Sequence, residues 1–155
     1  MAKFRILLPY NYSPNDQKAI RFVIDAFAGR EESTVTLFHA YTPLPEIDVA
    51  ANPENVKMRS GMTYLAGELK EKEDALKAVG EMLVAHGFNR DSVACMFLKR
   101  VKSPAEEIVE RAAGCNVLVL SRGAGKVTHF FTRSIYARVV AALKGESAQI
   151  VSLVL

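Results

Sequence analysis

The stretch NVLVLSRGAG (residues 116–125) joins a short apolar run to a turn that contains two glycines. Val117–Leu120 is wholly apolar, which is typical of a central strand buried on both faces of a parallel sheet. Gly123 and Gly125 follow, and glycine lets backbone amides approach a ligand closely. In open α/β sheets, ligands bind outside the carboxyl ends of the strands. This stretch therefore predicts a fold class and the place of a candidate site.

Strand-like and helix-like segments alternate along the rest of the chain. Periodic apolar positions indicate helices that begin near Pro14, Met62, Pro104 and Ile135, and Ser13 has the character of an N-cap. The alternation predicts one α/β domain over residues 1–155, with an open five-stranded parallel sheet and two helices on each face. The expected strands are Phe4–Leu8, Thr34–Ala40, Val93–Phe97, Val117–Leu120 and Ile150–Leu155.

The stretch Tyr41–Ser60 shows no clear period and contains three prolines, so we interpret it as a long loop with some local structure. The helix after it carries an apolar stripe on one face and a charged, solvated face opposite. The stripe consists of Met62, Leu65, Leu69, Leu76, Val79 and Leu83.

Composition narrows the class of protein. The formal net charge is only +3, and no apolar run approaches the roughly 18 residues that a membrane span requires. The N-terminus lacks the apolar stretch and cleavage site of a signal peptide. Cys95 and Cys115 are the only cysteines and have no close-spaced partner, so reduced thiols in a cytoplasmic protein are expected. Nucleic acid and membrane are not predicted partners.

Several catalytic or metal-binding patterns are absent from the sequence. No two histidines have metal-ligand spacing, and neither a nucleophile elbow nor a P-loop is present, so no metal site is predicted. His39 ends an apolar strand, and we interpret it as a packed, hydrogen-bonded side chain. Glu106 and Glu107 stand beside Glu110 in the third helix, and we interpret these carboxylates as a solvated face.

Two turns are expected to meet at the carboxyl edge of the sheet, namely Pro9–Ser13 and Ser121–Ser134. The second turn has the ingredients of an anion site, because its glycines free backbone amides and a helix N-terminus follows. A positive rim would attract a small anion or an acidic partner. It would consist of Lys99, Arg100, Lys102, Arg122, Lys126 and Arg133.

The last strand predicts a partner. Gln149–Leu155 is apolar and is expected at the edge of the sheet, where unpaired backbone groups invite pairing with another chain. We therefore expect a homodimer that pairs antiparallel across Ile150–Leu155, with an edge covered within one chain as the alternative.

Three segments resemble the universal stress protein family. The opening ILLPYNYSPNDQKAIRFV resembles the family's first strand and helix, and VKSPAEEIVERA resembles its third crossover. The segment NVLVLSRGAGKVTHFFTRSIYARVV is similar to its fourth strand, nucleotide loop and last helix. The resemblance implies an adenine nucleotide alpha hydrolase-like sheet with strand order 3-2-1-4-5.

The resemblance also implies a nucleotide motif, Gly-x2-Gly-x9-Gly-(Ser/Thr). Its positions fall on Leu120, Gly123, Arg133 and Ser134, so two of the three glycines are replaced. The family's adenine-side aspartate aligns with Asn11, and the next glycine aligns with Tyr12. The candidate nucleotide or anion cleft that follows comprises Pro9, Tyr10, Asn11, Ala40, Arg122, Gly123, Gly125, Arg133 and Ser134.

Three functional hypotheses remain open at this point. In the first, the protein is a cytoplasmic, non-catalytic, regulatory stress-response dimer with no cofactor and with lost or weak nucleotide binding. In the second, Arg122 and Arg133 hold the phosphates of ATP or AMP, with Mg²⁺, and hydrolysis is slow. In the third, the protein is an interaction protein that uses the Tyr41–Ser60 loop.

Overall fold

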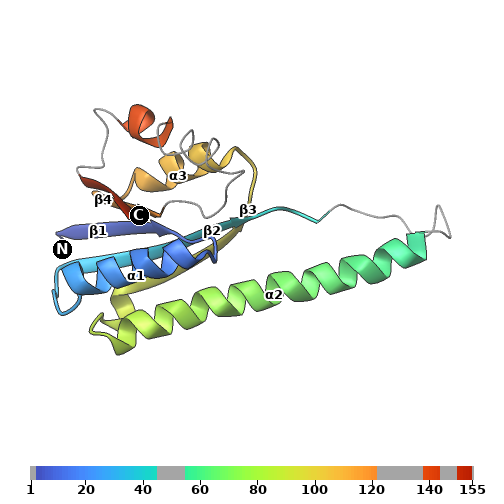
Figure 1. The fold of residues 1–155 in the computed structure, drawn as a ribbon, viewed down its shortest axis with the longest axis horizontal. Coiled ribbons are helices and arrows are strands. Elements are labelled where there is room, and N and C mark those ends of the chain that lie inside the picture. The colour runs from blue at the N-terminus through green and yellow to red at the C-terminus, as the bar shows by residue number, and fades with distance from the viewer. Residues whose placement is uncertain (1–2, 45–54, 122–137, 144–149, 155) are drawn as a thin grey trace.

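The fold was analysed in a computed structural model of the chain, in which residues 3–44, 55–121, 138–143 and 150–154 are described. Strands and helices alternate along these residues, as Figure 1 shows. Residues 138–143 are helical, and Arg90–Ser92 form a short 3-10 turn. The remaining elements are β1 (Phe4–Pro9), α1 (Pro14–Phe27), β2 (Ser33–Tyr41), α2 (Asn55–Ala85), β3 (Val93–Lys99), α3 (Pro104–Ala112), β4 (Val117–Ser121) and β5 (Ile150–Val154).

The strands form one sheet in the order β3-β2-β1-β4-β5, and all neighbouring pairs are parallel. β1 pairs with β2 on one side and with β4 on the other, so the strand order reverses at β1. The predicted α/β class with a parallel sheet is confirmed, as is the order of the first four strands. β5 pairs with β4 from Ile150 to Val154.

Helices cover both faces of the sheet and bury two hydrophobic cores. α1 and α2 pack on one face, where Ile6 and Leu37 meet Val23 and Leu83. On the other face, α3 and the helical residues 138–143 cover a core that includes Leu118. Figure 1 shows α1 and α2 on one side of the strands and α3 on the other. β1 contributes to both cores, which explains its continuous apolar run.

The interpretation of Tyr41–Ser60 as one long loop is wrong at both ends. Tyr41 belongs to β2, and α2 already begins at Asn55; residues 45–54 lie outside the described part. α2 extends well past the sheet in Figure 1. Because this half of the helix does not pack on the sheet, Leu65 is 41% exposed, whereas Leu76 is fully buried. The apolar pattern is therefore weakest where the helix begins.

Two helices, α1 and α3, begin with the same capping box. Ser13 caps α1 and Ser103 caps α3, and in each case the side chain accepts a hydrogen bond from the amide three residues later. Asp16 and Glu106 return the interaction to the cap, and a proline occupies the first helical position of each helix. The predicted starts of these helices are confirmed.

Candidate functional site

The turn between β1 and α1 is organised around the carboxylate of Asp16. This side chain stands in the first turn of α1 and has only 1% relative exposure. Its Oδ2 atom accepts hydrogen bonds from the backbone amides of Asn11 and Ser13 and from Ser13 Oγ, each at 2.9 Å. Negative charge is stabilised at this end of a helix by the helix dipole. These donors of the turn before α1 are therefore satisfied by the protein's own side chain.

Ser121, the last residue of β4, contacts the same carboxylate from a second strand. Its Oγ donates a hydrogen bond to Oδ1 of Asp16. β1 and β4 are neighbours, and the strand order reverses between them, which is where ligands bind in open α/β sheets. A buried carboxylate thus occupies this position among the described residues. An anion could reach the amides of Asn11 and Ser13 only by displacing Asp16, since two negative charges repel at contact distance.

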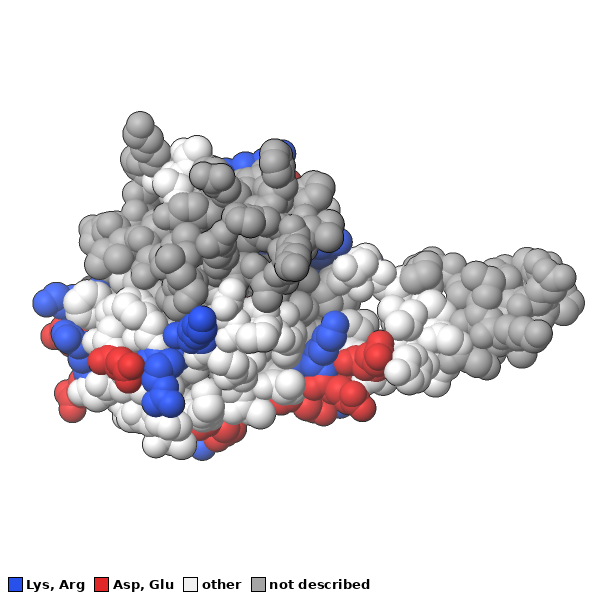
Figure 2. Space-filling model, in the orientation of Figure 1, with Lys and Arg blue, Asp and Glu red and all other residues white. Residues whose placement is uncertain are grey.

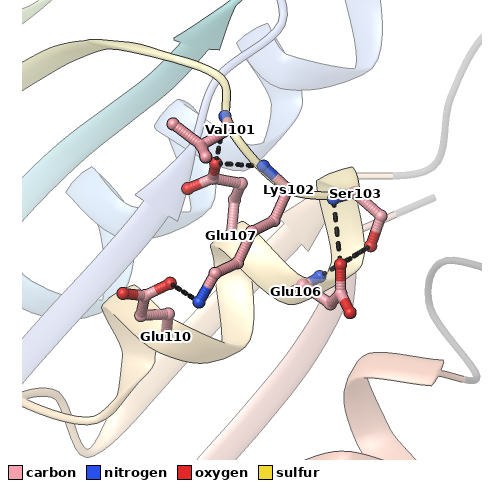
Figure 3. Close-up of polar contacts among 6 residues, drawn as sticks. All are labelled: Val101, Lys102, Ser103, Glu106, Glu107 and Glu110. Carbon is pink, nitrogen blue, oxygen red and sulfur yellow. Dashed lines mark hydrogen bonds and ion pairs between the residues drawn. The ribbon is translucent and has the colours of Figure 1, made fainter.

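The backbone amides just before α3 are likewise bonded by a carboxylate of the protein itself. Figure 3 shows Glu107 reaching back to the segment that follows β3. Its Oε1 atom accepts hydrogen bonds from the amides of Val101, at 2.7 Å, and Lys102, at 2.9 Å. These amides lower the pKa of the Glu107 carboxyl. The expectation that Glu107 belongs to a solvated face is wrong, because the chain leaving β3 folds over it and leaves it 5% exposed.

The other two carboxylates of this group have different surroundings. Glu106 accepts hydrogen bonds from the amide of Ser103 at 3.0 Å and from its Oγ at 2.8 Å, which lowers the Glu106 pKa. Glu110 forms an exposed ion pair with Lys102 at 3.0 Å. Glu106 and Glu110 are both exposed, as predicted, and Glu106 also takes part in the cap of α3 (Figure 3).

Aromatic rings line the carboxyl ends of β1, β2 and β3. The Tyr10 and Tyr12 ring centroids lie 4.8 Å apart, and Tyr12 lies 5.0 Å from the His39 ring. His39 stacks on Phe97 at 5.4 Å, and Tyr41 stacks on the same ring at 4.9 Å. Such contacts contribute beyond simple burial of area. They bind the three strand ends into one packed layer.

Tyr12 anchors this layer to α2. Its hydroxyl donates a 2.5 Å hydrogen bond to the carbonyl oxygen of Lys72. Its backbone has a φ of 60°, which is uncommon for a residue with a bulky side chain. Burial is the main cause that raises the pKa of Tyr12 to about 12. The side chain is thus held neutral against the helix.

His39 has the packed role that the sequence predicted. Its Nδ1 lies 2.8 Å from the carbonyl oxygen of Tyr10, so Nδ1 carries the proton and donates it. Burial lowers the pKa of His39, which favours the neutral ring. The imidazole therefore joins the turn after β1 to β2, as a hydrogen-bonded structural group.

The predicted positive rim is represented in the structure only by Lys99, Arg100 and Lys102; the other members lie outside the described residues. Lys102 is neutralised by Glu110. On the face in Figure 2, basic and acidic side chains are interspersed across the described part. The residues described form no group of histidine, cysteine, aspartate or glutamate that could hold a metal, and no helix among them is long and apolar enough to span a membrane.

Most of the chain matches one protein family. The model of the universal stress protein family matches residues 4–144. The chain belongs to the universal stress protein family. No curated protein matches this sequence.

Solved structures of universal stress proteins share the fold. UspA from Lactobacillus plantarum is 16% identical with a TM-score of 0.66, and the match covers 100% of this chain and 99% of that one. A universal stress protein in complex with cAMP is 14% identical with a TM-score of 0.59, covering 99% and 98%. An Arabidopsis thaliana family member with AMP bound is 15% identical with a TM-score of 0.51, covering 98% and 92%. At these identities the likeness shows the fold.

The structure places part of the cleft predicted from the universal stress protein resemblance. Pro9, Tyr10 and Asn11 follow one another at the end of β1. Tyr10 is 4% exposed within the α1–α2 core, and its hydroxyl accepts a 2.7 Å hydrogen bond from Gln17. Ala40 packs against the core on the opposite face, so the two side chains are not brought together. The other candidates, Arg122, Gly123, Gly125, Arg133 and Ser134, lie outside the described residues.

Three residues matter more at this edge than sequence analysis indicated. Asp16 carried a local signal, because Ser13-x-x-Asp16 has the spacing of a capping box. Ser121 and Glu107 carried none, since their partners lie 105 and five or six residues away along the chain. Leu120, at the family's first glycine position, is 6% exposed and belongs to the α3-side core.

Proposed function

We propose that this universal stress protein is a cytoplasmic, non-catalytic regulator of the stress response that has lost nucleotide binding or retains it only weakly. The observation that carries the proposal is the position of Asp16. Its carboxylate engages the amides of Asn11 and Ser13, in the turn before α1, and the hydroxyl of Ser121, at the point of the sheet where a ligand would bind. An adenine nucleotide would bring further negative charge to this place.

The residues at the family's glycine positions support the same proposal. Tyr12 replaces a glycine and is fixed by its hydrogen bond to Lys72, so its ring is not free to withdraw without cost. Leu120 replaces another glycine, and its side chain is committed to the α3-side core. Hydrolysis also lacks an available acid among the described residues at the strand ends, because Asp16 already accepts four hydrogen bonds.

The alternative is a universal stress protein that binds ATP or AMP and hydrolyses it slowly, with the phosphates in the Ser121–Ser134 loop. The relatives in complex with cAMP and AMP favour this alternative. Its phosphate groups would be held by Arg122, Arg133 and loop amides, outside the part of the chain described by the structure.

One experiment separates the two functions. The protein is purified without added nucleotide and denatured, and the released small molecules are identified by mass spectrometry. We expect no stoichiometric ATP or AMP, and no heat of ATP binding by calorimetry with Mg²⁺ at millimolar nucleotide. Co-purified nucleotide near one equivalent would overturn the proposal and support the alternative.

The proposed assembly is a homodimer through Ile150–Leu155. β5 forms an edge of the sheet, and among the described residues only β4 pairs with it, so its other side is the one proposed to pair with a second copy. We expect a dimer mass by light scattering at micromolar concentration. Amide exchange in β5 should slow as the concentration rises, and a monomer with unchanged exchange would contradict this interface.

A further inference from the structure

The chain between β1 and α1 turns two backbone amides toward one point. Tyr12, with a φ of 60°, is the only described residue other than glycine that has a positive φ. A left-handed residue within a turn forms a backbone nest, in which the amides on either side of it converge on an anion. The amides of Asn11 and Ser13 converge in this way, because both donate 2.9 Å hydrogen bonds to the same oxygen, Oδ2 of Asp16.

Two hydroxyl groups complete the set of donors. Ser13 Oγ donates to Oδ2 at 2.9 Å, and Ser121 Oγ, at the end of β4, donates to Oδ1. The buried carboxylate of Asp16 therefore accepts four hydrogen bonds, all from uncharged donors. Among the described residues, Asp16 forms no ion pair. Converging neutral donors of this kind bind an oxyanion well, since a hydrogen bond to a charged acceptor is roughly twice as strong as one between neutral groups.

The cap of α3 shows that a helix cap does not require this arrangement. Glu106 occupies the same position of a capping box as Asp16, three residues after the capping serine. Its side chain is exposed, and the hydrogen bonds that it accepts come from the amide and the hydroxyl of Ser103. The bonds that Asn11 and Ser121 donate to Asp16 go beyond capping, and they hold the carboxylate where the strand order reverses.

We propose that Asp16 is an autoinhibitory group, whose carboxylate occupies, as an internal anion, a site that would otherwise bind the carboxylate or phosphate oxygens of a small ligand. The inference rests on the proposed loss of nucleotide binding and supplies a cause for it. A side chain tethered beside its donors has a high effective concentration, so a free anion competes poorly with it. Removal of the carboxylate, with the four donors retained, should open the site.

The test is chemical rescue of the Asp16→Ala variant. This substitution removes the atoms of the carboxylate, and formate, the probe, supplies the same group without the tether. With three non-hydrogen atoms, formate binds no more tightly than roughly 0.5 mM, so it is titrated far above that concentration against sodium chloride of equal ionic strength. At about ten times its dissociation constant, formate should raise the melting temperature of the variant by about 3–6 °C and leave the wild type unchanged.

Two controls separate a binding site from general effects of salt or of lost stability. Asp25→Ala removes a carboxylate from the exposed face of the same helix and should show no rise specific to formate. Adding Ser121→Ala to Asp16→Ala removes one donor and should weaken the apparent affinity for formate by roughly tenfold. If Asp16→Ala does not fold alone, its refolding yield from urea in formate and in chloride measures the same rescue.

Inorganic phosphate and AMP replace formate in parallel titrations of the wild type and of Asp16→Ala. A rise in the variant with any of the three anions supports the site, and the set that acts distinguishes carboxylates from phosphates. A destabilised variant that responds to none of them would show that Asp16 is a structural cap alone. That result would overturn the inference and leave the proposed loss of nucleotide binding intact. Binding of AMP by the wild type would overturn both, since Asp16 would then not close the site.

Discussion

Ser121 Oγ donates a hydrogen bond to the Asp16 carboxylate and thereby joins the end of β4 to the first turn of α1, 105 residues earlier in the chain. The same carboxylate fixes the turn after β1 through the amides of Asn11 and Ser13. One buried side chain therefore holds together the two segments between which a ligand of this fold would bind. Its importance for stability and for the shape of this edge can be measured.

Asp16→Ala should lower the free energy of unfolding by about 2–3 kcal/mol, because it removes a helix cap and leaves buried donors without an acceptor. Urea denaturation measures the change. Asp25→Ala, on the exposed face of the same helix, is the control and should cost less than about 0.5 kcal/mol. Equal losses in the two variants would show that the carboxylate network contributes little.

Ser121→Ala should cost about 1 kcal/mol alone and much less when Asp16 is already alanine. The coupling is obtained from the unfolding free energies of the two single variants and the double variant. Additive losses would mean that the contact between Ser121 and Asp16 carries no energy.

Tyr12→Phe should remove one tyrosine that ionises late in an alkaline titration. The raised pKa of about 12 means that the fold favours the neutral phenol, so this contribution to stability is complete below pH 10 and is lost as the pH rises toward 12. Ultraviolet absorbance of tyrosinate follows the titration in the wild type and the variant. If the tyrosine lost in the variant is one that ionises near pH 10, burial does not hold the Tyr12 phenol neutral.

Glu107→Gln should reduce the acid sensitivity of the protein. The lowered pKa of Glu107 means that its ionised form stabilises the fold above the ordinary value of 4.5, and that this contribution is lost as the pH falls through the lowered pKa. Melting temperatures at neutral and acidic pH should therefore differ less in the variant than in the wild type. Glu110→Gln, in an exposed ion pair, is the control and should show wild-type acid sensitivity.

Gly67→Ala and Gly80→Ala should have opposite outcomes within the same helix. A Cβ at Gly67 meets nothing within 4 Å, so alanine should stabilise the protein by about 0.5–1 kcal/mol through helix propensity. A Cβ at Gly80 would meet Cys95 Sγ at 3.0 Å, so its variant should be at least about 1 kcal/mol less stable than Gly67→Ala. Equal stabilities would show that α2 can withdraw from β3 freely.

Local sequence was sufficient to predict the elements whose signals lie within a few residues. The apolar run Val117–Leu120 predicted a central strand, and Ser13-Pro14 with Asp16 marked the start of α1, because capping uses neighbouring atoms. The same logic failed at Asn55, where α2 begins beyond the sheet. Farther along the part of α2 that extends past the sheet, Tyr64 and Leu65 are exposed, so apolar periodicity is a weak signal there.

The sequence by itself determined the α/β class, the alternation of strands and helices, and the edge at which a site would form, since these follow from apolar periodicity and caps. Only the tertiary structure decided what fills that edge. Asp16 meets Ser121, Glu107 meets the amides after β3, and Tyr12 meets Lys72. These contacts join separate elements, and no local pattern encodes them, because hydrogen bonds between elements depend on how the chain packs in three dimensions.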